Sequence, residues 1–262
     1  GRNMYTLITG TTSGIGKEFA ESFAKKGYNL VTVAMNEEKL KEQKQTLESK
    51  YNISVKYIVK DLSIEESYSE IYNEVKASNI EIDILINNAG FATYGNYIDV
   101  EWQKQKNLAM VNMMAVMQLS YMFGKDMAKR KSGRIMNIAS IASFEPGPFM
   151  TMYYASKAFV RSFSEGLHEE LKDQGVIVTA ICPGPTKTKF EERASMKKSY
   201  MFKKMKVDTA KEVAEKSYKA MMKNKAVYVV GFYNKLIAFA TRFGSLKLNR
   251  KVAKKINIGT AK

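Results

Sequence analysis

The stretch Tyr5–Gly16, YTLITGTTSGIG, runs a short β-like segment directly into a glycine-rich turn, and the helical pattern EFAESFAKK follows at residues 18–26. Gly10 permits a sharp turn, Gly14 lets the backbone approach a pyrophosphate, and Gly16 lets a helix pack close to the strand. The N-terminus of that helix would then face the anion. The stretch therefore predicts a strand, a phosphate-binding turn and a helix, although the glycine spacing G-x-x-x-G-x-G also fits an ordinary turn.

Six further β-like runs alternate with helical patterns along the chain. With the first run, they cover residues 5–9, 29–34, 53–59, 82–87, 134–139, 176–181 and 226–230. Strands that are separated by helical crossovers indicate an α/β fold, in which helices cover both faces of a parallel sheet. Gly27 and Gly175 stand where a helix should end and the next strand begin, as a left-handed helix cap requires. No linker or internal repeat interrupts the pattern, so we interpret residues 1–262 as one domain.

The composition is that of a folded protein in a reducing compartment. Of the 262 residues, 45% are hydrophobic, which is ample for a buried core. Cys182 is the single cysteine, which excludes an internal disulfide framework, and no secretory signal pattern is found near the N-terminus. We therefore expect a cytoplasmic location. No apolar stretch approaches the ~20 residues that span a bilayer, so we expect no transmembrane helix, whereas contact with a membrane surface stays open.

The net charge of +16 is placed unevenly along the chain. Residues 1–186 hold 21 Lys/Arg and 21 Asp/Glu, whereas residues 187–262 hold 21 Lys/Arg and 5 Asp/Glu. A lysine-rich surface can simply reflect solvation, but solvation does not predict a neutral front followed by a basic tail. The asymmetry suggests an anionic partner.

Two further segments carry polar residues in a recognisable arrangement. NNAG at residues 87–90 ends the fourth β-like run, and Tyr153 precedes Lys157 by four residues in MYYASK at residues 152–157. With the glycine-rich turn, these residues resemble the short-chain dehydrogenase/reductase family over roughly residues 4–231. The resemblance implies a Rossmann-type, doubly wound parallel sheet of seven strands in the order 3-2-1-4-5-6-7, followed here by a basic C-terminal helical extension.

The family carries a catalytic set of asparagine, serine, tyrosine and lysine, which the resemblance places at Asn112, Ser140, Tyr153 and Lys157. Helical spacing alone leaves Tyr154 open beside Tyr153, because i,i+3 and i,i+4 neighbours share one helical face. The family pattern has the tyrosine four residues before the lysine and the serine thirteen before the tyrosine, which favours Tyr153. Taken singly, Asn112 could be a packing amide and Ser140 a turn residue. Tyr154 is interpreted as a packing or subunit-contact residue.

The resemblance implies a proton transfer coupled to a hydride transfer. A free phenol has a pKa of about 10 and is a poor proton donor at neutral pH. The Lys157 ammonium would stabilise the Tyr153 phenolate and hydrogen-bond the nicotinamide ribose, and a pKa shift of about three units corresponds to roughly 4 kcal/mol. Ser140 would orient the substrate oxygen, and Asn112 would hold a water that leads from Lys157.

The resemblance also implies a set of cofactor contacts. They are Gly10, Thr12, Ser13, Gly14, Ile15, Gly16, Ala34, Asn36, Asp61, Leu62, Asn88, Ala89, Gly90, Tyr153, Lys157, Pro183, Gly184, Thr186 and Thr188. VAMN at residues 33–36 lacks the acidic residue that would bind a ribose 2′-hydroxyl, and it also lacks the arginine common in NADP-using relatives. The missing carboxylate favours NADP over NAD, with Thr12, Ser13 and Asn36 as hydrogen-bonding candidates. Asp61 would contact adenine or simply lie near a helix cap. In residues 182–188, the backbone at Thr186 and the hydroxyl of Thr188 would hold the nicotinamide carboxamide, or the segment is only a proline turn.

No metal site is expected. His168 is the only histidine and lacks the H-E-x-x-H spacing that places two ligands on one helix, so we interpret it as structural. Cys182 has no second cysteine or histidine with which to form a metal site or a nucleophilic pair, and we expect a small buried residue.

The basic tail has two parts. Residues 187–206, KTKFEERASMKKSYMFKKMK, fall where the family carries its substrate lid, and this mixture of basic and apolar residues suits an apolar substrate that bears an anion. Within residues 232–262, one helical stripe holds Leu236, Phe239, Ala240 and Phe243. Such a basic amphipathic helix could rest on an anionic membrane surface or pack on its own domain. No nucleic-acid-binding module is recognised, so a nucleic-acid partner is not expected.

The leading hypothesis is an NADP(H)-dependent carbonyl reductase or alcohol dehydrogenase that acts on a hydrophobic, acyl or lipid-like substrate near a membrane. The tail resembles the branch of the family that includes 3-ketoacyl reductases and 17β-hydroxysteroid dehydrogenases. The family also implies a homodimer or homotetramer, in which helices around residues 103–131 and 153–172 pair between subunits. The alternative is a non-catalytic regulator that binds a cofactor and presents its basic tail to a membrane or nucleic acid, and the intact catalytic set argues against it.

Overall fold

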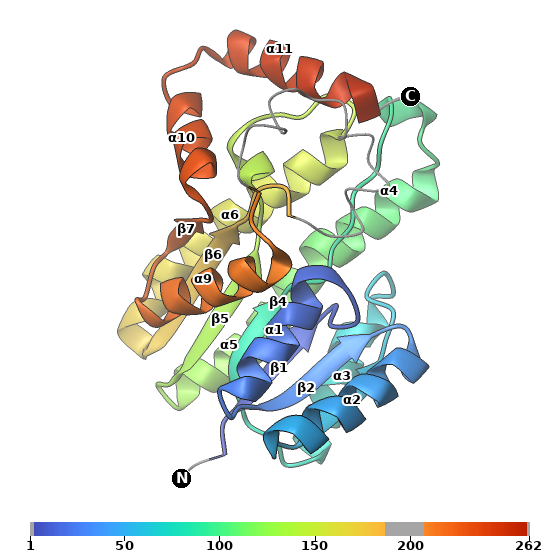
Figure 1. Ribbon diagram of the computed structural model, residues 1–262, viewed down its shortest axis with the longest axis vertical. Coiled ribbons are helices and arrows are strands. Elements are labelled where there is room, and N and C mark those ends of the chain that lie inside the picture. The colour runs from blue at the N-terminus through green and yellow to red at the C-terminus, as the bar shows by residue number, and fades with distance from the viewer. Residues whose placement is uncertain (1–2, 187–206, 261–262) are drawn as a thin grey trace.

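One parallel sheet forms the centre of the computed structural model, which describes residues 3–186 and 207–260 (Figure 1). Seven strands lie in the order β3-β2-β1-β4-β5-β6-β7, and every neighbouring pair is parallel. They are β1 Tyr5–Thr9, β2 Asn29–Ala34, β3 Val55–Val59, β4 Ile82–Asn87, β5 Gly133–Ile138, β6 Val176–Cys182 and β7 Val227–Val229. The predicted strand order is confirmed, and each strand lies where the sequence predicts it.

Helices connect the strands. They are α1 Gly14–Lys25, α2 Glu37–Tyr51, α3 Glu66–Ala77, α4 Trp102–Ala109, α5 Ala115–Lys129, α6 Thr151–Leu171, α9 Ala210–Met222, α10 Phe232–Thr241 and α11 Leu246–Asn257. A π-helical turn, Met110–Met114, joins α4 to α5, and short 3-10 turns lie at Tyr97–Asp99, Ile141–Phe144, Lys172–Gln174 and Ile258–Thr260. Gly27 and Gly175 have φ angles of 88° and 78°, so the predicted left-handed ends before β2 and β6 are confirmed.

The alternation of side chains along the strands creates two cores. Successive side chains of a strand point to opposite faces, and Leu7 and Ile8 of β1 are both fully buried, one in each core. Ile8 packs in a cluster with Phe19 and Phe23 of α1, which also includes residues of α9. Leu7 packs in a cluster with Tyr68 of α3 and residues of α5. Helices therefore cover both faces of the sheet, as predicted, and burial of each such side chain stabilises the fold by about 1.5–3 kcal/mol.

Buried amides hold the carboxyl ends of the central strands together. Asn87 ends β4 and pairs in register with Asn137 of β5. The Nδ2 atom of Asn87 donates to Oδ1 of Asn137 over 2.8 Å, and Nδ2 of Asn137 donates to the hydroxyl of Ser164 in α6 over 3.0 Å. These hydrogen bonds fix the carboxyl ends of the strands, from which the loops with the predicted site residues emerge.

The C-terminal extension consists of two helices. α10 begins three residues after the carboxyl end of β7, so it starts at the same edge of the sheet as the site loops. Residues 242–245 separate α10 from α11, and the Ser245 hydroxyl caps α11 by accepting the N–H of Leu248 over 3.2 Å. In Figure 1 the two helices, drawn in red, form the end of the molecule opposite to the N-terminus. The predicted helical extension is therefore present, and it is divided around Gly244, where the helical pattern of the sequence is interrupted.

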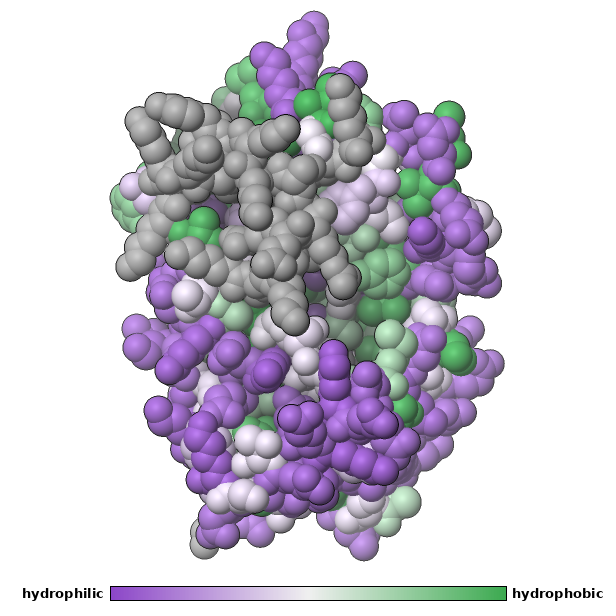
Figure 2. Space-filling model, turned by 45° about the vertical axis from the view of Figure 1, so that its right-hand side comes forward, coloured by the Kyte–Doolittle hydropathy of each residue, from purple (hydrophilic) through white to green (hydrophobic). Residues whose placement is uncertain are grey.

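The surface differs between the two ends of the molecule. Figure 2 shows that hydrophilic side chains dominate the lower part of the face in view, whereas the larger hydrophobic patches lie above it. Within residues 3–186 and 207–260, no helix has both the length and the apolar content that a membrane span needs.

Candidate active site

The turn after β1 is shaped for a phosphate group. Gly10 and Gly14 have φ angles of 72° and 56°, which residues with a side chain rarely adopt. A Cβ atom at Gly16 would overlap the carbonyl oxygen of Gly10, so only glycine lets α1 come this close to β1. The first turn of α1 has no acidic residue, and the Ser13 side chain makes no capping hydrogen bond there. The N–H groups at this helix end therefore fit the pyrophosphate of a dinucleotide.

Asn88 and Ala89 brace this turn from the end of β4. The hydroxyl of Thr9 accepts the N–H groups of Asn88 and Ala89 over 3.0 and 2.9 Å. The side-chain amide of Asn88 donates to the carbonyl oxygens of Thr9 and Gly10 over 3.1 and 3.2 Å. Sequence reasoning assigned cofactor contacts to Asn88 and Ala89 but missed the role of Thr9, which stands one residue before the glycine motif.

The predicted contacts after β2 and β3 lie at the same edge of the sheet, but two of their side chains are already in local hydrogen bonds. Asn36 caps α2, and its Oδ1 atom accepts the N–H of Lys39 over 3.0 Å. The Oδ1 atom of Asp61 accepts the N–H and the hydroxyl of Ser63 over 2.9 and 2.7 Å. Met35 is 69% exposed beside them, so the space next to Asn36 is open to solvent.

Asn112 lies in the π-helical turn between α4 and α5 and is buried. Its Nδ2 atom donates to the carbonyl oxygen of Phe91 over 3.0 Å and to the hydroxyl of Ser156 over 3.1 Å, and its Oδ1 accepts the N–H of Phe91 over 3.1 Å. π-Helical turns occur frequently at functional sites. Asn112 therefore holds the loop after β4 against α6.

Lys157 is a buried cation, with 5% of its surface exposed. Its Nζ atom donates to the carbonyl oxygen of Ile138 over 2.9 Å and lies 5.7 Å from the centre of the Tyr153 ring. A Cβ atom at Gly90 would lie 3.2 Å from Oδ1 of Asn112 and 3.4 Å from Nζ of Lys157, so both groups border this glycine. Burial lowers the pKa of Lys157 to about 8, and Cys182 opposes this shift.

Tyr153 lies in the first turn of α6 and faces Ser140. Burial raises the pKa of the Tyr153 phenol, and a hydrogen bond with Ser140 acts in the opposite direction. The Ser140 hydroxyl also accepts the N–H of Ala142 over 3.1 Å, which caps the 3-10 turn after β5. The structure therefore brings Asn112, Ser140, Tyr153 and Lys157 together from three segments of the chain.

Tyr154 faces away from this set and contacts the C-terminal extension. Its hydroxyl donates to Oδ1 of Asn257 in α11 over 3.3 Å, and Nδ2 of Asn257 donates to the carbonyl oxygen of Pro148 over 3.1 Å. Burial raises the pKa of Tyr154, and its hydrogen bond with Asn257 lowers it. Tyr154 is thus a packing residue, as predicted, but its partner is α11. No sequence signal indicates this contact, because 103 residues separate its two partners.

The surroundings of Tyr153 are aromatic. Tyr94, in the loop after β4, has a pKa raised to about 12 by burial and by the neighbouring Tyr153. The N–H of Gly95 donates to the carbonyl oxygen of Phe149 over 2.9 Å, which joins the loop after β4 to the loop after β5. Sequence reasoning missed Tyr94, since the loop carries no motif around it.

The segment after β6 is described only in part. The carbonyl oxygen of Pro183 accepts the N–H of Ile141 over 2.9 Å, and Gly184 is approached closely by Asn234 of α10. Thr186 is the last described residue before the gap, so Thr188 and the predicted lid at residues 187–206 lie outside the described residues.

The remaining sequence candidates have structural roles. Cys182 is fully buried, as predicted, and its sulfur lies 3.8 Å from the hydroxyl of Ser143. His168 lies on α6, and its Nδ1 atom is 2.7 Å from the carbonyl oxygen of Val178, to which it donates. His168 thus links α6 to β6, and Cys182 links β6 to the 3-10 turn after β5.

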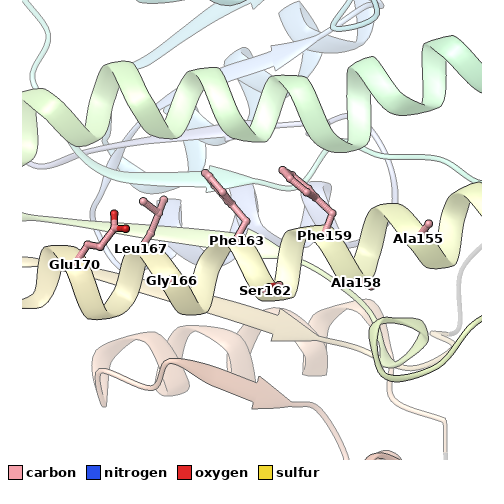
Figure 3. Close-up of a pocket in the computed structure, with 8 residues that line it drawn as sticks. All are labelled: Ala155, Ala158, Phe159, Ser162, Phe163, Gly166, Leu167 and Glu170. Atoms are coloured by element: carbon pink, nitrogen blue, oxygen red, sulfur yellow. The ribbon is translucent and has the colours of Figure 1, made fainter. Parts of the chain in front are cut away.

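A groove on α6 lies apart from this site. It is lined by residues between Ala155 and Glu170, and Figure 3 shows Phe159, Phe163 and Leu167 projecting from the same side of the helix. The rings of Phe159 and Phe163 stack with their centres 5.5 Å apart. None of the four predicted catalytic residues lines this groove, because helical periodicity turns Tyr153 and Lys157 to the opposite side of α6.

The comparison with known families decides the class of the chain. The sequence profile of short chain dehydrogenases matches residues 5–199. The chain belongs to the short-chain dehydrogenase family. The glycine-rich turn, the NNAG segment and the Tyr153 and Lys157 pair all lie within the matched part, and the predicted family is confirmed.

The relatives of this short-chain dehydrogenase agree with the predicted branch. The very-long-chain 3-oxoacyl-CoA reductase of Rattus norvegicus is 34% identical over 184 residues, which cover 68% of this chain and 58% of the rat protein. Hydroxysteroid dehydrogenase-like protein 1 of Gallus gallus is 33% identical over 208 residues, which cover 76% of this chain and 61% of the chicken protein. The chain thus spans about three fifths of the length of these relatives. The resemblance to the branch with 3-ketoacyl reductases is confirmed.

A solved structure shows the same fold. The short-chain dehydrogenase from Sphingobium yanoikuyae in complex with NADPH has a TM-score of 0.80 and is 28% identical, and the match covers 92% of this chain and 93% of that chain. The predicted Rossmann-type architecture of this short-chain dehydrogenase is therefore confirmed.

Proposed function

We propose that this short-chain dehydrogenase transfers hydride between NADP(H) and a carbonyl or alcohol on a hydrophobic, acyl or lipid-like substrate. The observation that carries the proposal is the position of Lys157. Its ammonium is buried beside the Tyr153 ring and donates to one backbone carbonyl oxygen. Among residues 3–186 and 207–260, no carboxylate forms an ion pair with Lys157. A lysine that only supports the fold is seldom buried in this way, so the burial of Lys157 beside Tyr153 favours a catalytic role.

Tyr153 is the proposed proton donor to the substrate oxygen. Its raised pKa keeps the phenol protonated at neutral pH, which is the form needed for reduction of a carbonyl. The phenolate left after proton transfer would be stabilised by the Lys157 ammonium, because each charge relieves the desolvation of the other. Ser140 would hydrogen-bond the same substrate oxygen, and Asn112 would hold a water that leads from Lys157.

NADP is the proposed cofactor, and its nicotinamide ring supplies the hydride when it is bound. The glycine-rich turn and Asn88–Gly90 would hold the pyrophosphate and the adjoining sugar, while Tyr153 and Lys157 would contact the nicotinamide ribose. Residues 34–36 include no carboxylate that would repel a 2′-phosphate. The NADPH-bound Sphingobium structure supports this choice. Pro183, Gly184, Thr186 and Thr188 would hold the carboxamide.

The proposed substrate class rests on the surroundings of Tyr153 and on the relatives. Tyr94 is a buried aromatic neighbour of Tyr153. Gly95, which follows Tyr94, donates its N–H to the carbonyl oxygen of Phe149 in the loop after β5. Apolar side chains at this place would favour a hydrophobic substrate. The name of the rat relative indicates a 3-oxoacyl thioester as its substrate, and the basic composition of residues 187–206 would suit such an anionic carrier.

The proposal treats residues 1–262 as one dehydrogenase domain with a lid at about 187–206 and an extension at about 232–262. A homodimer or homotetramer would form through α5 and α6, because α6 carries the apolar groove of Figure 3 on the side away from Tyr153. A cytoplasmic location, with peripheral contact between the basic C-terminus and a membrane, completes the proposal.

A thermal-shift titration with NADPH and NADH in parallel tests the cofactor. A ligand that binds only the folded state raises its stability by RT ln(1 + [L]/Kd), so the preferred cofactor gives the larger shift at equal concentration. We expect a larger shift with NADPH, followed by NADPH oxidation with 3-ketoacyl thioesters or hydrophobic ketones that rises with chain length. A shift with neither cofactor would overturn the proposal.

A further inference from the structure

The outer face of α10 is apolar and exposed. Ala238 is buried on the inner face, where Asn234 approaches Gly184 and donates to the carbonyl oxygen of Val230 over 2.8 Å. The large apolar side chains recur at intervals of three or four residues and therefore share the opposite face. With exposures of 50–75%, they are Phe232, Leu236 and Phe239 of α10 and Phe243 in the turn that follows it. Within residues 3–186 and 207–260, the large apolar side chains of the predicted stripe are thus exposed, while the opposite side of the helix packs on the domain.

α11 follows α10 in the chain and adds a basic face. Ala253 and Asn257 are buried on its inner side. Its exposed basic residues are Lys247, Arg250, Lys251, Lys254 and Lys255. Apolar side chains border them, with Leu246 exposed by 75% and Leu248 by 55%. No carboxylate occurs between residues 216 and 262 to neutralise this surface.

We propose that α10 and α11 form a docking surface for an anionic lipid bilayer. An exposed stripe of phenylalanine and leucine beside lysine and arginine matches an interface that offers acyl chains and negative headgroups together. A second copy of the chain that used the same face would bring two basic surfaces together, and their repulsion opposes such a dimer. The partner that complements both the apolar and the charged residues is therefore a lipid surface.

The docking surface lies beside the active site. α10 starts at the carboxyl edge of the sheet, and Asn257 of α11 joins Tyr154 and Pro148. The two helices thus face the bilayer on one side and hold the segment around Tyr153 on the other. The consequence that a lipid-like substrate enters from the bilayer rests on the proposed function, whereas lipid binding itself does not.

Vesicle sedimentation of the full chain tests the docking surface. The probes are vesicles of phosphatidylcholine alone and vesicles that also contain phosphatidylglycerol, each at low and high salt. We expect binding to the phosphatidylglycerol vesicles and loss of this binding at high salt, since exposed charges are screened. Phe239→Ser with Phe243→Ser should weaken binding by at least about tenfold. Lys251→Ala with Lys255→Ala should weaken it by about fivefold for each lysine.

Matched controls lie at the opposite edge of the sheet. Lys223 and Lys225 are exposed just before β7 begins, and Met222 is 44% exposed beside them. Lys223→Ala with Lys225→Ala, and Met222→Ser, should sediment with vesicles as the unchanged protein does. If the α10 and α11 variants sediment with vesicles as much as the unchanged protein does, the proposal is overturned. It is also overturned if the unchanged protein does not bind the vesicles. Light scattering that shows Phe239→Ser with Phe243→Ser turning a larger oligomer into a smaller one would overturn it too, because the face would then join copies of the chain.

Turnover of a water-soluble ketone separates this proposal from the proposed function. The docking variants should keep this turnover unchanged, which also shows that they fold. Vesicle binding by a protein without reductase activity would leave the docking surface standing and count against the function alone.

Discussion

Replacing Lys157 with methionine should change how stability depends on pH. The ammonium of Lys157 is buried and donates to the carbonyl oxygen of Ile138. Burial lowers its pKa from 10.5 to about 8. A difference of this size corresponds to about 3 kcal/mol between the two protonation states. Lys157→Met keeps the apolar bulk of the side chain and removes the titration.

The sign follows from proton binding in the two states. Below pH 8 both the folded and the unfolded chain hold the proton on Lys157, so the folded state bears the full cost of the buried charge. Between about pH 8 and 10.5 the folded state releases this proton while the unfolded state keeps it. The free energy of unfolding therefore rises with pH in this window. The unchanged protein should gain about 3 kcal/mol relative to Lys157→Met across it.

Urea unfolding of both proteins, without cofactor and at one protein concentration, measures this difference. The unfolding midpoints are followed by circular dichroism over the pH range that spans 8 and 10.5. Ionisable groups that lie away from Lys157 are common to both proteins, so their contributions cancel in the difference. If the two curves run parallel, Lys157 is not a buried cation in the folded chain, and the physical basis of the proposed mechanism is lost.

Three further substitutions test other parts of the account. Gly16→Ala should abolish the NADPH-dependent thermal shift, because its Cβ atom would overlap the backbone of the phosphate turn. Asn87→Ala should lower the free energy of unfolding by about 1–3 kcal/mol, measured in urea, since Asn137 loses a buried donor over 2.8 Å; an unchanged midpoint would show that the amide pair does not stabilise the edge. Asn257→Leu should increase proteolysis of the C-terminal extension, because Tyr154 loses its partner on α11. Equal digestion of the two proteins would show that the contact does not hold α11.

The strands and their order could be predicted because two independent signals agree. Short β-branched and apolar runs such as NLVTVA follow a helix-ending glycine, here Gly27, and the family resemblance supplies the strand order. The site residues could be placed for a similar reason: the spacing from Lys157 selects Tyr153 over Tyr154, and the structure shows Tyr154 facing α11 instead. That spacing is the family's pattern, because helix geometry alone leaves Tyr154 open beside Tyr153.

The features that could not be predicted depend on contacts between distant segments. The burial of Lys157 depends on the carbonyl oxygen of Ile138, and the contact of Tyr154 with Asn257 crosses 103 residues. The helical spacing of the apolar residues predicts the stripe on α10, but this spacing does not show which face of the helix packs on the domain. Small or polar residues such as Ala238 form the inner face, which reverses the usual arrangement of an amphipathic helix on a core.

The most direct test of the proposed function is the turnover of Tyr153→Phe beside that of Tyr154→Phe, with NADPH and the best hydrophobic ketone. We expect Tyr153→Phe to lose about 10²–10⁴-fold in kcat because it lacks the proton donor, while its thermal shift with NADPH persists. Tyr154→Phe should stay within a few-fold of the unchanged protein, since the Tyr154 hydroxyl donates its hydrogen bond to Asn257 of the C-terminal extension. Substantial turnover by Tyr153→Phe would contradict the proposed mechanism, and a selective loss in Tyr154→Phe would move the proton donor to that residue.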